Sequence, residues 1–184
     1  MIAAATAALV SYPTDEELMA RVLRCYKPNC RYLTAMTLLV TAEPGSGQDV
    51  TVRGLADLAI GESCYIDDTG HLNAVEVNIA YNQMLYYAVA KSVQERLGPI
   101  FATWTMADFW SRQLPDILIT RLVSRFRKQA DRSRFSGEIE FGYARQRRLT
   151  STGRPLIAME TAFRFWDGRD GRVDGEVTVA IVAS

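Results

Sequence analysis

The chain has 184 residues, of which 48% are hydrophobic, and this is enough for one domain with a sizeable core. Its 21 basic residues balance its 21 acidic residues, so the zero net charge gives no general attraction to nucleic acid or to an anionic membrane. Cys25, Cys30 and Cys64 lack the spacing of a zinc site, and a single histidine cannot complete the usual ligand set. We therefore expect reduced thiols in a cytoplasmic protein, without a metal or another cofactor.

The N-terminal residues are small and apolar, but residues 1–10 have no basic flank and are too short to span a bilayer. We expect a flexible lead-in over residues 1–12. Next, Thr14 and Glu17 have the spacing of a capping box, which predicts a short amphipathic helix over residues 14–24.

Two strands are predicted after this helix, over residues 32–40 and 50–60, because both runs are apolar and contain β-branched or aromatic side chains. The turn-forming sequence Glu-Pro-Gly-Ser-Gly at residues 43–47 separates them. Gly54 lies inside the second run, where a glycine can mark a β-bulge.

The longest helical pattern covers residues 73–97, which contain neither glycine nor proline before the end of the pattern. Apolar side chains recur at the spacing of one helical face at Val75, Ile79, Tyr86 and Val89. The pattern predicts a buried helix, roughly 36 Å long if it is unbroken.

The only histidine, His71, lies directly before this helix, and it is the one side chain whose ordinary pKa suits acid–base chemistry near neutral pH. Asn73 and Glu76 have the spacing of an N-cap and its capping box. The turn at Gly70 therefore brings His71 to a helix N-terminus, where backbone amides and the helix dipole favour a developing negative charge. The structural alternative stays open: Gly70 can serve only the turn, Asn73 only the cap, and His71 only a local hydrogen bond.

The C-terminal half is rich in strands. An aromatic segment at residues 104–114 indicates a short helix, and strands are predicted over residues 116–128, 135–148, 155–166 and 173–182. Short strands, one long helix and four further strands describe an α+β fold in which an antiparallel sheet wraps around a central helix. We expect residues 1–184 to form a single domain.

Asp67, Gly70, His71 and Asn73, placed immediately before the helix, resemble a motif of hot-dog fold thioesterases. More narrowly, residues 61–66, 69–76 and 82–83 resemble the FcoT family, as do residues 124–128 and 165–167.

The resemblance implies one of two enzymatic activities. One is that of a (2E)-enoyl-[acyl-carrier protein] glycyltransferase of isonitrile lipopeptide biosynthesis. It adds glycine to C3 of an enoyl thioester by Michael addition, and hydrolysis then releases a 3-(carboxymethylamino) fatty acid. The other is that of a long-chain fatty acyl-CoA thioesterase. The partners would be an acyl-carrier protein or coenzyme A thioester, glycine, and further copies of the chain in a dimer or trimer of dimers. A non-catalytic acyl-binding domain is the alternative of another class.

The resemblance also assigns active-site roles to Tyr32, Tyr65, Asn73 and Asn82. Independent support exists for Asn82, which falls on the apolar face of the helix, where an unpartnered amide would cost about 1–3 kcal/mol. Its structural alternative is a bond to the sheet backbone. On pattern alone, Tyr32 and Tyr65 would be core residues.

For glycine addition, we expect His71 to accept the ammonium proton and the amides at the helix N-terminus to hold the enolate oxygen. Arg127 or Lys128 would anchor the glycine carboxylate, and Tyr32 and Gly70 would contact the substrate. A solvated strand face is the alternative for the two cations. The capping box accounts for Glu76, and Cys64 is expected to be an inert thiol.

Overall fold

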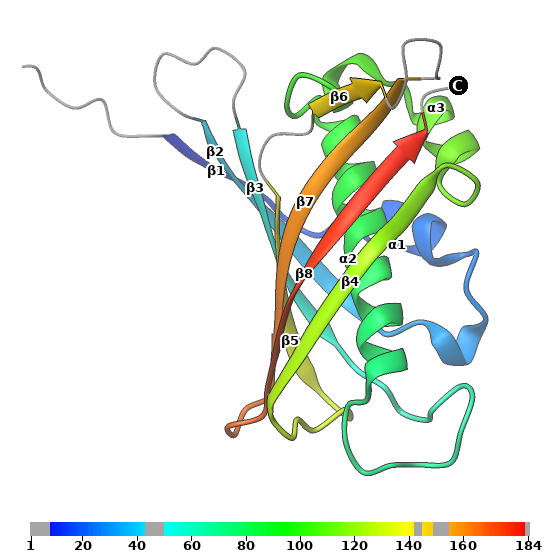
Figure 1. Cartoon of the computed structure of the whole chain (residues 1–184), viewed down its shortest axis with the longest axis vertical. Helices are drawn as coiled ribbons and strands as arrows, with labels where there is room; N and C mark the ends of the chain where they lie inside the picture. The colour runs from blue at the N-terminus through cyan, green and yellow to red at the C-terminus, as the bar shows by residue number, and fades with distance from the viewer. Residues whose placement is uncertain (1–7, 43–49, 142–144, 149–154, 183–184) are drawn as a thin grey trace, which may run out of the picture.

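The computed structural model describes residues 8–42, 50–141, 145–148 and 155–182 (Figure 1). The described strands form one antiparallel sheet in the order β1-β2-β3-β5-β7-β8-β4, and β6 pairs with β7. Their bounds are β1 (Ala8–Tyr12), β2 (Leu33–Ala42), β3 (Val50–Leu58), β4 (Ile117–Lys128), β5 (Phe135–Phe141), β6 (Arg145–Arg148), β7 (Pro155–Trp166) and β8 (Arg172–Val182). The described helices are α1 (Glu16–Leu23), α2 (Ala74–Gln94) and α3 (Met106–Arg112), with short 3-10 turns η1 (Pro28–Cys30) and η2 (Phe101–Thr103).

The sheet curves around α2, the helix that runs along its concave face (Figure 1). Most of α2 is buried, including Tyr81, Met84, Leu85 and Val89 at 0% exposure. The predicted α+β fold class, an antiparallel sheet wrapped around one long helix, is therefore confirmed as the hot-dog arrangement.

Four details of the sequence prediction are corrected. Residues 8–12 of the expected lead-in form β1, which pairs with β2 from Ala8↔Ala42 to Tyr12↔Leu38; residues 1–7 lie outside the described chain. The predicted strand over 135–148 is divided between β5 and β6, and residues 142–144 between them are not described, nor is the predicted turn at 43–47.

The other two corrections concern single residues. Gly54 pairs regularly with Leu38, without a bulge. A Cβ atom at this position would lie 2.0 Å from Cε of Met36, so close packing explains the glycine. The first helix is capped by Asp15, whose side chain accepts a hydrogen bond of 2.9 Å from the backbone N–H of Leu18; the Thr14 hydroxyl instead accepts one from Met36 N–H.

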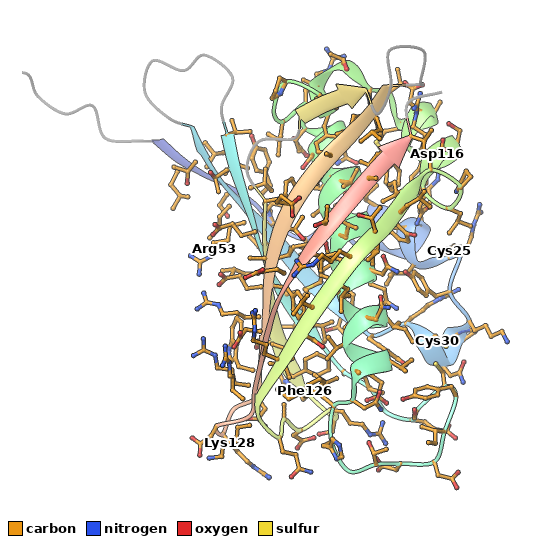
Figure 2. The ribbon with its side chains drawn as sticks, viewed as in Figure 1. Cys25, Cys30, Arg53, Asp116, Phe126 and Lys128 are labelled. Atoms are coloured by element: carbon orange, nitrogen blue, oxygen red, sulfur yellow. The ribbon has the colours of Figure 1, made fainter. Side chains whose placement is uncertain are left out.

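One edge of the sheet is formed by β4, a strand of 12 residues. Leu122 and Phe126 pair with Val177 and Val173, which are buried in the core, so they share the concave face of the sheet. Phe126 is nevertheless 44% exposed and lies near one end of β4 (Figure 2). An apolar strip along this edge is thus only partly covered within one chain.

Candidate active site at the N-terminus of the central helix

The candidate site is built on the irregular loop of residues 59–73, which joins β3 to α2. Three backbone hydrogen bonds hold its ends to other segments: Ala59 N–H donates to Tyr32 O at 2.9 Å, Ile60 N–H to Arg132 O at 3.0 Å, and Leu72 N–H to Ala130 O at 2.9 Å. Between these bonds, residues 61–71 make no backbone–backbone hydrogen bond within the described part of the chain. The loop therefore lies over the helix N-terminus with few backbone ties.

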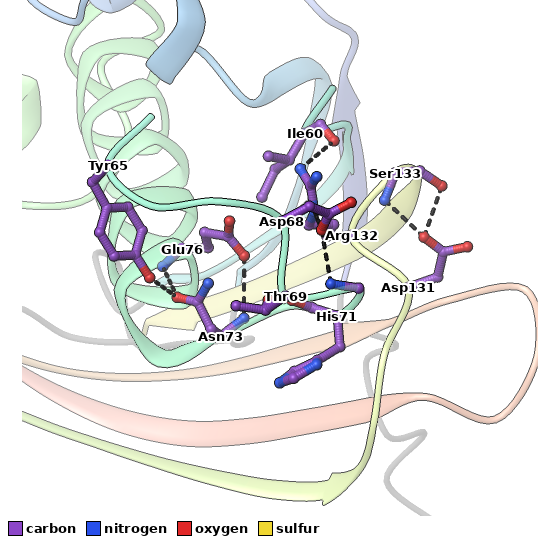
Figure 3. A network of polar contacts seen from close by, with 11 residues as sticks. Ile60, Tyr65, Asp68, Thr69, His71, Asn73, Glu76, Asp131, Arg132 and Ser133 are labelled. Carbon is purple, nitrogen blue, oxygen red and sulfur yellow. Dashed lines mark hydrogen bonds and ion pairs between the residues drawn. The ribbon is translucent and has the colours of Figure 1, made fainter. Parts of the chain in front are cut away.

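The predicted capping box is present and sets the geometry of the site (Figure 3). Oδ1 of Asn73 accepts hydrogen bonds from the backbone N–H groups of Val75 at 3.0 Å and Glu76 at 3.1 Å. In return, Oε2 of Glu76 accepts from the backbone N–H of Asn73 at 3.2 Å. The hydroxyl of Tyr65 donates to the same Oδ1 atom at 2.6 Å. Because three donors bind its oxygen, the orientation of the Asn73 amide is fixed. Its Nδ2 group lies on the side of the amide away from these donors.

Four unsatisfied polar atoms lie in the loop and at the start of α2. Among the described residues, Ser63 Oγ, His71 Nδ1, Asn73 Nδ2 and Glu76 Oε1 are buried and have no hydrogen-bond partner. Buried polar groups are nearly always paired in folded proteins, so four such atoms within 14 consecutive residues need an explanation. One explanation is a bound substrate that supplies the missing hydrogen-bond partners, because binding sites keep donors and acceptors free.

Arg132 joins the site from the segment between β4 and β5. Its Nε donates to Oδ1 of Asp68 at 2.8 Å, and its Nη1 donates to the carbonyl of Ile60 at 3.1 Å. The hydrogen bond from Arg132 and a second one from the backbone N–H of Gly70 to the same oxygen together lower the pKa of Asp68 to about 2. Only 7% of Arg132 is exposed, so it is a buried cation next to the loop.

Tyr32 contacts the loop, and Gln83 holds Tyr32 in place. The Tyr32 hydroxyl lies 3.3 Å from the sulfur of Cys64, and burial, followed by this contact, raises the pKa of Tyr32 far above its ordinary value. The amide oxygen of Gln83 accepts from the backbone N–H groups of Tyr32 at 2.8 Å and Leu33 at 2.9 Å, and its nitrogen donates to the carbonyl of Cys30 at 2.5 Å. Gln83 thereby fixes the start of β2 on α2.

His71 reaches the helix N-terminus as predicted, but its ring makes no hydrogen bond with Tyr65, Asn73 or Glu76 (Figure 3). Gly70 has a φ of 73°, the left-handed region that glycine adopts without strain, so the turn itself requires it. The structure therefore places a half-buried imidazole beside the capping box and leaves its Nδ1 atom free.

The two cations expected to anchor glycine are engaged elsewhere. Arg127 donates to both carboxylate oxygens of Asp174, at 2.9 and 3.2 Å, and Lys128 forms an ion pair with Asp170. Lys128 lies at the end of β4 (Figure 2) and shares a hollow of about 400 Å³ with Gly70. Neither cation contacts the capping box.

Asn82 lies nine positions after Asn73, which is about 13 Å along the helix axis. It shares a helical face with Val75 and Asn78. The sequence analysis predicted that this face is buried, but Val75 on it is 46% exposed. The prediction that Val75 is buried is wrong, and Asn82 itself is half-buried. The structure brings Tyr65, Asn73 and His71 together at the start of α2. The backbone of Tyr32 lies next to Gln83, the residue after Asn82, and its hydroxyl reaches Cys64 in the loop.

Comparison with known proteins shows the family of the chain. A family model described as an FcoT-like thioesterase domain matches residues 21–181. The chain belongs to the FcoT-like thioesterase family. A relative from Streptomyces coeruleorubidus, named a (2E)-enoyl-[ACP] glycyltransferase, is 51% identical over 92% of this chain and 98% of its own length. A relative of the same name from Mycobacterium bovis is 33% identical over 91% of this chain and 87% of its own.

Among solved structures, a sigma28-regulated virulence protein from Campylobacter jejuni matches with a TM-score of 0.46 and 11% identity, over 91% of this chain and 97% of that one. Within the described residues of this FcoT-like protein, no helix is long and apolar enough to cross a membrane, and no group of histidine, cysteine and acidic residues is arranged to hold a metal ion. Cys25, Cys30 and Cys64 are free thiols.

The sequence analysis missed three polar residues of this FcoT-like site: Ser63, Gln83 and Arg132. Gln83 carried a detectable signal, because a polar side chain next to Met84 in a helix of this length is expected to have a buried partner. Arg132 carried none, since it follows β4 in a polar turn and reaches the loop only through the fold.

Proposed function

We propose that the protein is a (2E)-enoyl-[acyl-carrier protein] glycyltransferase, which adds glycine to C3 of an enoyl thioester and then hydrolyses the thioester. The product is a 3-(carboxymethylamino) fatty acid. The observation that carries this proposal is the 51% identity, over nearly the full length of both chains, with a relative of that name. The free donors and acceptors at the start of α2 support it, because addition and hydrolysis both need them.

In the proposed reaction, Nδ2 of Asn73 donates a hydrogen bond to the thioester oxygen as negative charge develops there. The sequence had favoured backbone amides for this role, but those of Val75 and Glu76 already donate to Asn73 Oδ1. The positive end of the α2 dipole lies at the same place and favours the enolate. Tyr65 acts as a positioning residue, since its hydroxyl holds the oxygen of the Asn73 amide.

His71 and Gly70, which precede α2, and Tyr32, whose hydroxyl reaches Cys64 in the loop, are proposed to contact the acyl thioester or glycine. Tyr32 stays protonated at neutral pH, because burial raises its pKa. Asn82 is proposed to act further along the helix, on the face that the chain leaves partly open. Lys128 is better placed than Arg127 to meet a carrier-protein phosphate, since it lies beside Gly70.

The open edge at β4 and the exposed face of α2 support a proposed homodimer or trimer of dimers, in which a second copy covers these surfaces. We further propose that the enzyme acts in the cytoplasm on an acyl-carrier protein substrate, in isonitrile lipopeptide biosynthesis. The proposed assembly rests on the uncovered strip on β4 and on the family resemblance, whereas the proposed compartment, carrier protein and pathway rest on the resemblance and on the relative's name.

The test is product analysis by mass spectrometry after incubation of a (2E)-enoyl-carrier protein with and without ¹⁵N-glycine. The proposal expects a labelled 3-(carboxymethylamino) acid that forms only with glycine. Release of the unmodified enoic acid at the same rate in both reactions would identify a plain thioesterase, the activity named in the family description. A protein that binds the acyl chain and releases neither acid would be the non-catalytic alternative.

A further inference from the structure

The carboxylate of Glu76 is fully buried, at 0% exposure, yet only one of its oxygen atoms is used. Oε2 completes the capping box by accepting from Asn73 N–H, whereas Oε1 has no partner within the described chain. A capping box needs only one oxygen. Burial of an unsatisfied carboxylate oxygen is costly, so the second oxygen calls for a role beyond helix capping.

Glu76 lies among the other polar groups of the site. Its charge adds to the effect of burial in raising the pKa of Tyr65, and it adds to the larger effect of Asp68 in raising the pKa of Arg132. These groups come from the loop and from the segment after β4, so Glu76 is enclosed from both sides. Figure 3 shows its carboxylate between the Asn73 backbone and the loop.

We propose that Oε1 of Glu76 binds the ammonium group of glycine and accepts its proton, which makes Glu76 a catalytic residue of the addition step. The inference rests on the proposed glycyltransferase function and assigns the proton acceptor in it. Some hot-dog thioesterases use a carboxylate of the central helix as nucleophile or base, but the sequence analysis accounted for Glu76 by its capping box. The structure adds the buried, unpartnered Oε1 atom.

The proton balance closes on this residue. Glu76 takes one proton from the glycine ammonium group, and the freed nitrogen lone pair forms the bond to C3. The electrons of the C2–C3 double bond move onto the thioester oxygen, which Asn73 Nδ2 stabilises. Glu76 then returns its proton to C2 as the enolate collapses. Glycine and the enoyl thioester combine without a net gain or loss of protons, and the enzyme is unchanged.

Two features favour Glu76 over His71 for this task. A carboxylate attracts the ammonium cation before it takes the proton, whereas a neutral imidazole does not. In addition, Glu76 is locked to Asn73 by the capping box, so the proton acceptor and the thioester donor are held on one rigid unit.

Glycine reaches Glu76 when the loop that covers it shifts. Residues 61–71 make no backbone–backbone hydrogen bond within the described chain, so the shift has to release side-chain bonds, those of Tyr65 with Asn73 and of Asp68 with Arg132. The exposed loop residues Tyr65 and Ile66, at 48% and 52%, are already at the surface.

The test compares Glu76→Gln with wild type, because a glutamine preserves the capping box but cannot accept the ammonium proton. Two amines are used: glycine, and aminooxyacetate, whose amino group is unprotonated at neutral pH. We expect Glu76→Gln to lose glycine addition by roughly 100-fold or more, a typical effect of a general base, and to lose addition of aminooxyacetate at least tenfold less. Glu62→Gln, in the exposed part of the same loop, is the matched control and should leave both rates unchanged.

Equal losses with both amines, or no loss with either, would overturn the role of Glu76. So would a loss selective for glycine in His71→Ala but not in Glu76→Gln, because the acceptor would then be His71. Circular dichroism and thermal melting confirm that each variant is folded. If wild-type enzyme adds no glycine at all, the proposed function fails and this inference fails with it, and that result is distinct from a failure of Glu76 alone.

Discussion

The hydroxyl of Tyr65 donates a hydrogen bond of 2.6 Å to Oδ1 of Asn73, and this bond helps to fix which end of the Asn73 amide is free. Because Oδ1 also receives two backbone N–H groups, the oxygen is saturated and Nδ2 is left as an unpaired donor. The residue that caps the helix thereby becomes the residue that can stabilise an oxyanion. Tyr65 contributes although it is itself 48% exposed.

Replacing Tyr65 by phenylalanine removes one of the three donors that orient Asn73. We expect kcat to fall by about five- to tenfold, the kinetic equivalent of one neutral hydrogen bond of about 1 kcal/mol, with KM little changed. Addition and hydrolysis should fall together, because both use the same donor. Steady-state assays of the two reactions measure this, with Tyr12→Phe on β1 as the control; a loss confined to KM would make Tyr65 a binding residue.

Asn73 has two functions that substitutions can separate. Asn73→Asp keeps the capping oxygen but removes the Nδ2 donor, so we expect stability close to wild type and a roughly 10²–10³-fold loss of kcat. Asn73→Ala removes both, and should lose similar activity and also about 0.5–2 kcal/mol of stability. Urea unfolding and kinetics on the pair give the result. Wild-type activity in Asn73→Asp would show that Nδ2 is not the oxyanion donor.

Asn82 lies on the partly open face of α2, so its replacement by leucine leaves the core intact. We predict that Asn82→Leu folds normally and turns over more slowly, by about tenfold if its amide makes one substrate hydrogen bond. Asn78→Leu, one turn earlier on the same exposed face, is the matched control. Unchanged turnover in Asn82→Leu would make Asn82 an ordinary half-buried amide.

The ion pair of Asp68 with Arg132 predicts how low pH affects the stability of the loop. The pKa of Asp68 is lowered to about 2 by Arg132 and the Gly70 N–H, so the pair stabilises the fold above the ordinary aspartate pKa. This contribution should be lost as the pH falls from about 4 towards 2. Thermal melts across that range compare wild type with Asp68→Asn. Their difference in Tm should shrink on acidification, and a constant difference would mean that the ion pair does not control loop stability.

The uncovered strip on β4 predicts self-association. We expect sedimentation at micromolar concentration to show a dimer or larger oligomer, and Phe126→Glu to shift it towards monomer, because a charge would enter an apolar contact. Arg125→Glu places the same charge on the opposite face of β4 and is the control. A wild-type monomer under these conditions would contradict the proposed assembly.

The features that were predictable from sequence are those encoded locally. The start of α2 followed from the spacing of Asn73 and Glu76, because a capping box is a four-residue pattern. The turn at Gly70 followed in the same way. The fold class followed from one long helix among short alternating strands.

Features that depend on distant contacts were missed. Residues 8–12 form a strand only because β2 offers its edge, 30 residues later, and no local pattern marks that pairing. The buried side of α2 was misassigned at Val75 because the sheet wraps most of the helix and leaves little amphipathic contrast. Arg132 could not be connected with Asp68, 64 positions earlier, until the fold placed them together.

The most direct test of the central claim follows the carrier protein itself by intact mass spectrometry during a single turnover with glycine. The account predicts that the enoyl-carrier protein gains the mass of one glycine before any free acid appears, and that this species then disappears as the 3-(carboxymethylamino) acid is released. Free enoic acid released from a carrier protein that never gains the mass of glycine would contradict it.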